Sequence, residues 1–147
     1  MSDIKDKVFE DEFMEVQSGL ISLCIELVGE SVDKIFVYCS IERTMRMFNA
    51  FFEVNGEIKT LNLMGIVRPQ STQFLRLGTQ DLNKVVDICT HYDMKIPTEM
   101  KLIYDVKSTK FNAEYKYDEI CSLKTGKAPG EVFLEWIEEM KQLNVEQ

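Results

Sequence analysis

The sequence predicts an α+β fold: a mostly antiparallel five-stranded sheet packed with helices, in the order α-β-β-β-α-β-β-α. Apolar residues recur every three or four positions in three segments, as in helices, and at every second position in others, as in strands. The two kinds of segment do not alternate one by one, as they would in a parallel βαβ sheet. A chain of 147 residues suits one core of ordinary size, so we expect a single domain over residues 1–147.

The first predicted helix covers residues 6–29. Its apolar stripe has alternating spacings of four and three residues, as the core-facing side of a helix requires. The stripe consists of Phe9, Phe13, Val16, Leu20, Leu23 and Leu27. Acidic residues occupy the opposite side, and Gly29 is suited to end the helix.

Three strands are predicted next. Residues 33–42 are rich in β-branched and aromatic side chains, and a polar break separates them from a second strand over residues 45–54. The dipeptide Asn55-Gly56 is typical of a two-residue hairpin turn. Residues 57–63 then return as a third strand, which indicates an antiparallel meander.

The second half of the chain predicts a helix, a hairpin and a final helix. Residues 65–78 show no sustained period and predict a loop or a short helical turn. Thr79 is placed to cap the second helix, which must end before Pro97. Residues 99–108 and 110–119 then alternate as two paired strands. The second helix buries Leu82, Val85, Val86, Cys89 and Tyr92; the last one opens at Pro129 and buries Phe133, Trp136, Ile137, Met140 and Leu143.

The net charge of −8 is concentrated at one end of the sequence. Residues 1–33 hold nine acids against Lys5 and Lys7, a net charge of −7, and the remaining 114 residues sum to −1. Such a field opposes contact with nucleic acid or anionic lipid and favours basic partners, although a solvated helix face explains it as well. We therefore expect no nucleic-acid or membrane partner. The N-terminal residues lack the pattern of a signal peptide, and we expect a cytoplasmic protein.

The residues that usually carry catalysis or bind metals are scarce. His91 is the one histidine, and Cys89 lies two positions away, which on a helix places the two side chains on different sides. The four cysteines form no C-x-x-C pair and predict reduced, buried thiols. No phosphate-binding glycine motif occurs. We expect no catalytic residue, no metal site, no cofactor and no enzyme activity.

Several segments together resemble the YezG-like immunity-protein family of Gram-positive bacteria. They are VDKIFVYCSIE with FNAFFEVNGEI, the helix DLNKVVDICTHY, the segment IPTEMKLIYDVKSTKFNAEYKYDEI, and the closing helix that holds Trp136. The resemblance covers about residues 6–143. It implies an antitoxin that binds and blocks a polymorphic toxin, in some members a nuclease exported by a type VII secretion system.

The acidic residues of the first helix are the expected contact with such a toxin. A nuclease domain presents positive charge to its substrate, and an acidic face can occupy that surface. We expect Glu10, Asp11, Glu12 and Glu15 to form this contact. The alternative is a small-molecule-binding or regulatory α+β module whose sheet and helices enclose an apolar pocket.

Overall fold

The computed structural model describes residues 2–43, 45–122 and 124–146. Its elements follow the predicted order. They are α1 (Ser2–Val28), β1 (Lys34–Glu42), β2 (Met45–Val54), β3 (Glu57–Thr60), α2 (Arg68–His91), β4 (Glu99–Asp105), β5 (Phe111–Lys116) and α3 (Pro129–Glu146).

The five strands form one antiparallel sheet in the order β3-β2-β1-β4-β5, so the predicted α+β fold is confirmed. β1 is the central strand, and eight of its nine residues are buried. It pairs with β2 along its whole length and with β4 over residues 34–40. The turn between β2 and β3 has positive φ at Asn55 and Gly56, as the predicted hairpin requires.

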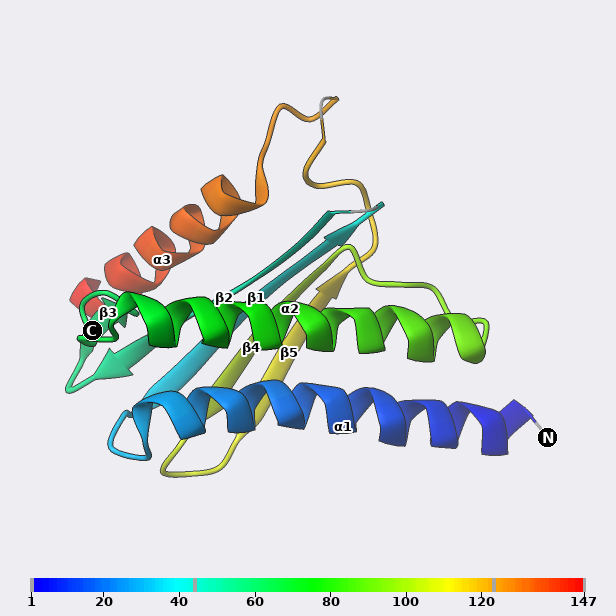
Figure 1. Cartoon of the computed structure of the whole chain (residues 1–147), viewed down its shortest axis with the longest axis horizontal. Helices are drawn as coiled ribbons and strands as arrows, with labels where there is room; N and C mark the ends of the chain where they lie inside the picture. Colours follow the sequence, from blue (N-terminus) through cyan, green and yellow to red (C-terminus); the bar gives the residue numbers. More distant parts are fainter. Residues whose placement is uncertain (1, 44, 123, 147) are drawn as a thin grey trace.

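Helices α1 and α2 run side by side and antiparallel across one face of the sheet (Figure 1). They cover the odd-numbered residues of β1 and the even-numbered residues of β2 and β4, which form the larger core. The N-terminal end of α1 and the C-terminal end of α2 extend past the sheet (Figure 1). In the part of the chain that the structure describes, none of the helices has an apolar stretch long enough to cross a membrane.

Helix α3 packs on the opposite face of the sheet, at the β3 side (Figure 1). Trp136 is the centre of this second core. Its ring lies 5.0 Å from the ring of Phe51, 5.8 Å from that of Phe36 and 6.3 Å from that of Tyr38. Lys101 places its ammonium group 5.5 Å from the Trp136 ring, on the side of β4.

The prediction of a loop over residues 65–78 is wrong beyond Val67, because α2 begins at Arg68. Pro69 lies in the first turn of this helix, where its missing N–H costs nothing. Gly78 lies inside the helix because the ring of Phe48 on β2 approaches the backbone there. Thr79 is therefore no cap. Its hydroxyl donates a hydrogen bond to the carbonyl oxygen of Leu75, one turn earlier, at 2.7 Å.

Other bounds differ by a few residues. α1 begins at Ser2 instead of residue 6, and β3 ends at Thr60 instead of residue 63. The predicted burial of Leu143 is also wrong, since this side chain is 46% exposed. In the last turn of α3, the neighbouring residue Asn144 makes the contact with the sheet, because its side-chain amide donates hydrogen bonds to the Glu53 carboxylate and the Gly56 carbonyl oxygen.

Candidate functional site

The site predicted from the sequence is the acidic side of α1, and two kinds of contact hold this helix in place. Leu20 and Cys24 are fully buried against the sheet. Gln17 is also fully buried, and its side-chain oxygen accepts a hydrogen bond from the Tyr115 hydroxyl of β5 at 2.7 Å. Since a buried amide needs a partner, this bond fixes the rotation of α1 about its axis. The acids therefore have defined directions.

The four predicted contact residues do not share one face. Residues four apart on a helix lie almost above one another, whereas neighbours are turned by about 100°. Asp11 and Glu15 accordingly point outward from the same side of α1, and both are exposed. Glu10 is exposed on one flank, and Glu12 is half-buried on the other. The structure thus brings Asp11 and Glu15 together and separates Glu10 from Glu12.

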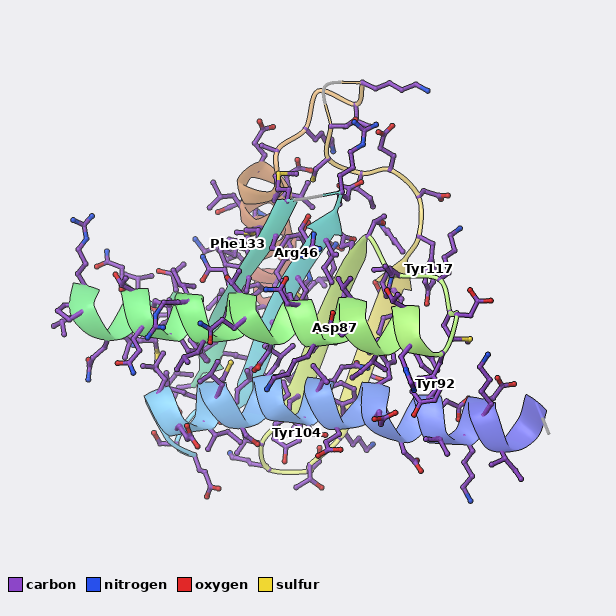
Figure 2. All side chains as sticks on the ribbon, turned by 45° about the vertical axis from the view of Figure 1, so that its right-hand side comes forward. Arg46, Asp87, Tyr92, Tyr104, Tyr117 and Phe133 are labelled. Atoms are coloured by element: carbon purple, nitrogen blue, oxygen red, sulfur yellow. The ribbon has the colours of Figure 1, made fainter. Side chains whose placement is uncertain are left out.

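Glu12 makes a contact within the protein. Figure 2 shows Tyr92 at the end of α2, close to α1. The carboxylate of Glu12 raises the pKa of the Tyr92 hydroxyl, because a hydrogen bond to this carboxylate favours the neutral phenol and the negative charge of Glu12 repels the phenolate. The Tyr92 ring also packs edge-on against Phe9 of α1, with 6.0 Å between the ring centroids. Glu12 therefore helps to join the two projecting helix ends.

The other described acidic side chains of α1 form no ion pair. Seven ion pairs connect the described side chains, and none of them includes a residue of α1. Asp33, just after the helix, is different, because it pairs with Lys107 at 3.6 Å and accepts a hydrogen bond from the Asn55 N–H. The outer side of α1 thus carries carboxylates that form no ion pair within the described chain, although Lys5 and Lys7 lie on the same helix.

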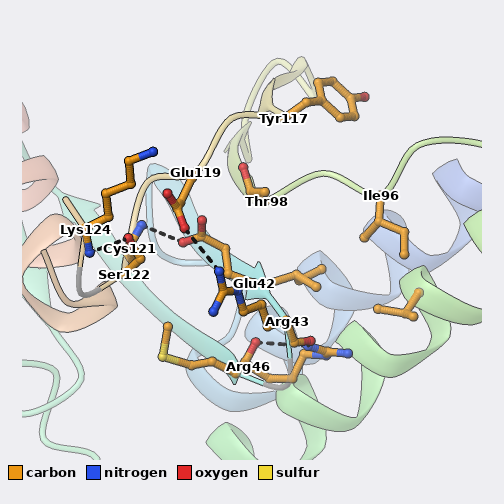
Figure 3. A pocket seen from close by; sticks show the side chains of 13 residues that line it. Glu42, Arg43, Arg46, Ile96, Thr98, Tyr117, Glu119, Cys121, Ser122 and Lys124 are labelled. Carbon is orange, nitrogen blue, oxygen red and sulfur yellow. Dashed lines mark hydrogen bonds and ion pairs between the residues drawn. The ribbon is translucent and has the colours of Figure 1, made fainter.

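A second candidate is an open cleft of about 880 Å³ at the end of the sheet where β1 turns into β2 (Figure 3). The tip of β1–β2, the segment before β4 and the segment after β5 surround it. Its polar lining includes Glu42, Arg43, Arg46, Glu119 and Lys124, and its apolar lining includes Ile41, Met45, Val86 and Ile96. This cleft was not predicted from the sequence. The one sequence signal is an arginine in a two-residue turn between strands, where glycine or asparagine is usual.

Glu42 anchors one wall of the cleft. The side chain is buried at the end of β1, and its two oxygens accept hydrogen bonds from the N–H groups of Ile120 and Cys121 at 2.8 Å and 2.6 Å. These bonds hold the long connection between β5 and α3 against the sheet. Glu42 therefore has a structural role, because each of its carboxylate oxygens already accepts a hydrogen bond from the backbone.

The groups that most often perform catalysis lie apart. His91 is exposed and Cys89 is fully buried, as their spacing predicts. All four cysteines are buried free thiols, and burial raises the pKa of each. Among the described residues, no three His, Cys, Asp or Glu side chains come together as a metal site would need.

Comparison with protein-family models and with curated proteins finds no match to this chain. The resemblance to YezG-like immunity proteins therefore stays a prediction from sequence segments.

Proposed function

We propose that this protein is an immunity protein that binds a secreted toxin and blocks it by covering its active surface. The observation that supports the proposal best is the group of exposed acids on α1, including Glu10, Asp11 and Glu15. None of these three side chains forms an ion pair with a described residue. A toxin that cleaves nucleic acid must present basic residues to its substrate. Carboxylates without internal partners attract such a surface from a distance and then pair with it.

The proposed mechanism needs no chemistry on the toxin. A rigid helix carries the acids, since Gln17 and the buried side chains of α1 fix its position on the sheet. Such preorganised charges lose little conformational freedom on binding, which favours a stable complex. Binding would then exclude the substrate both sterically and electrostatically.

Co-expression tests the function. Candidate toxin domains of secreted proteins, taken first from the genes that neighbour the one for this chain, are expressed in cells with and without the protein. We expect the protein to restore growth and to co-purify with the toxin domain. Growth arrest that persists while the protein is abundant and folded would contradict the immunity function.

Charge-neutral variants test the surface separately. The triple variant Glu10→Gln, Asp11→Asn, Glu15→Gln spares Glu12, which contacts Tyr92. A matched control neutralises three exposed acids elsewhere, Glu114, Glu131 and Glu139. We expect the α1 variant to lose protection and the control to keep it. Equal protection by both variants would refute the α1 surface, even if the protein still neutralises the toxin.

A further inference from the structure

The cleft at the β1–β2 tip is separate from the acidic surface of α1, and its charges have the opposite sign. Three cations line it, Arg43, Arg46 and Lys124, with two carboxylates. Glu42 is occupied by backbone N–H groups, and Glu119 forms an exposed pair with Arg43 at 3.7 Å. Among the described residues, no carboxylate lies within ion-pair distance of Arg46 or Lys124.

Hydrogen bonds to backbone carbonyl oxygens orient the side chain of Arg46. One of its terminal nitrogens, Nη1, donates to the carbonyl oxygens of Arg43 at 2.8 Å and of Met45 at 3.0 Å. Its Nε is shielded from solvent and has no acceptor in the described part of the chain. A guanidinium has five N–H donors, so donors of Arg46 remain unused. The group is therefore oriented before any ligand arrives.

The turn that carries Arg43 is strained at the mouth of the cleft. Arg43 has a φ of 54°, in the left-handed region that disfavours residues with a Cβ. The next hairpin uses Asn55 and Gly56 at such positions, which is the usual solution. An arginine kept in a strained conformation beside a cleft is typical of a functional position. Its pair with Glu119 is exposed and weak, so another anion can replace it.

The other side of the cleft is apolar. Ile41 lies directly opposite Arg46 in the β1–β2 pairing, so both side chains project from the same face of the sheet. Val86 of α2 also lines the cleft, as does Ile96, which Figure 3 shows on the segment before β4. A volume of about 880 Å³ lies within the range of small-molecule sites. A guanidinium next to aliphatic side chains suits a ligand with an anionic head and an apolar body.

We propose that this cleft binds a small amphipathic carboxylic acid, with its carboxylate on Arg46 and its apolar body against Ile41, Val86 and Ile96. The lining cations exceed the lining carboxylates by one, which matches a single negative charge. A phosphate, with its second charge, would leave negative charge without a counter-ion. The site is independent of the proposed immunity function, because it uses other residues on another part of the molecule.

Octanoate is a suitable probe, measured by calorimetric titration and by the shift in Tm. A ligand that binds only the folded state raises Tm. We expect octanoate to bind and raise Tm, and we expect acetate, octanol and inorganic phosphate to bind at least tenfold more weakly. Octanol that binds as well as octanoate would overturn the role of the charge. Equal or tighter binding of phosphate would overturn the choice of a carboxylate, and no binding of octanoate would overturn the site.

Two variants locate the binding. Arg46→Gln should weaken octanoate binding at least tenfold, and Arg76→Gln, an exposed arginine of α2 outside the cleft, should not change it. If Arg46→Gln fails to fold, Arg43→Gly decides, because glycine accepts the positive φ and removes only the side chain. Arg43→Gly should weaken binding without lowering Tm. Unchanged octanoate affinity in the folded variant would overturn the proposal.

Discussion

Gly78 offers a test of how α2 packs on the sheet. A Cβ added at this position would overlap the ring of Phe48, which is buried and lies 5.1 Å from the ring of Phe74. The ring therefore has no free space into which it can turn. Gly19 of α1 is the matched control, since an added Cβ there meets no atom within 4 Å. Both glycines lie inside helices, so alanine gains the same helix propensity at each.

The expected changes in the free energy of unfolding follow from the surroundings of Gly19 and Gly78. Replacing glycine by alanine inside a helix stabilises by about 1 kcal/mol. Gly19→Ala should gain this amount, which for a chain of this length raises Tm by roughly 3 °C. Gly78→Ala gains the same propensity but adds an overpacking cost of about 1–3 kcal/mol. The difference between the two variants isolates the packing cost, because the propensity contribution cancels.

Urea unfolding followed by circular dichroism measures both variants. We expect Gly78→Ala to be less stable than Gly19→Ala by about 1–3 kcal/mol. Phe48→Leu, which makes room, should reduce that difference when it is combined with Gly78→Ala. If Gly78→Ala is stabilised as much as Gly19→Ala, α2 does not contact β2 at this point and the described packing is wrong.

Three further predictions concern buried polar groups and the second core. Burial raises the pKa of the Cys24 and Cys39 thiols above the ordinary value of 9.0, so the unfolded state loses these protons first. These two thiols should therefore leave the free energy of unfolding unchanged below about pH 9, and above it each should lower this free energy by about 1.4 kcal/mol per pH unit, in urea unfolding at several pH values. Glu42→Gln replaces one of the two acceptor oxygens by an NH2 group, so that one of the N–H groups of residues 120–121 loses its acceptor. This change should lower the free energy of unfolding by about 1–3 kcal/mol and speed hydrogen exchange at these residues. Trp136→Ala should cost about 3–5 kcal/mol in thermal unfolding, because this ring contacts three aromatic side chains of the sheet.

Each of these predictions has a result that would contradict it. A Cys24→Ala, Cys39→Ala double variant should show a shallower decline above pH 9 than the wild-type chain, and an unchanged slope would assign the decline to other groups. Slow exchange at residues 120–121 in Glu42→Gln would show that the carboxylate does not hold this segment. Fluorescence offers a check on Trp136, the one tryptophan of the chain. Its emission should move to longer wavelength on unfolding, and emission at the wavelength of a solvated indole in the native state would contradict its burial.

The order of elements could be predicted from the sequence because most elements have strong and regular patterns. β1 has buried side chains on both faces and reads as a run of β-branched and aromatic residues. Asn55-Gly56 marks the hairpin between β2 and β3 unambiguously. The first three turns of α2, about residues 68–78, were missed because Pro69 and Gly78 are common breakers. Pro69 is harmless in the first turn, and the reason for Gly78 is a contact with Phe48, some 30 positions away in the sequence.

The candidate sites were less predictable than the fold. The sequence places four acids on α1, but the rotation of this helix depends on Gln17 and its bond to Tyr115, 98 positions further on. For that reason, the inward contact of Glu12 could not be separated from the outward direction of Asp11 and Glu15. The cleft unites side chains from the ends of β1 and β2, from the segment before β4 and from the segment after β5, such as Arg46, Ile96 and Glu119, which only the sheet order brings together.

The association rate of this protein with its toxin domain, measured by stopped flow at several salt concentrations, tests the central proposal most directly. We expect the Glu10→Gln, Asp11→Asn, Glu15→Gln variant to associate on the order of tenfold more slowly than the wild-type chain at low salt, with a difference that shrinks as salt screens the charges. The control variant at Glu114, Glu131 and Glu139 should associate at nearly the wild-type rate. Equal rates for the two variants at every salt concentration would contradict recognition through the acidic surface of α1.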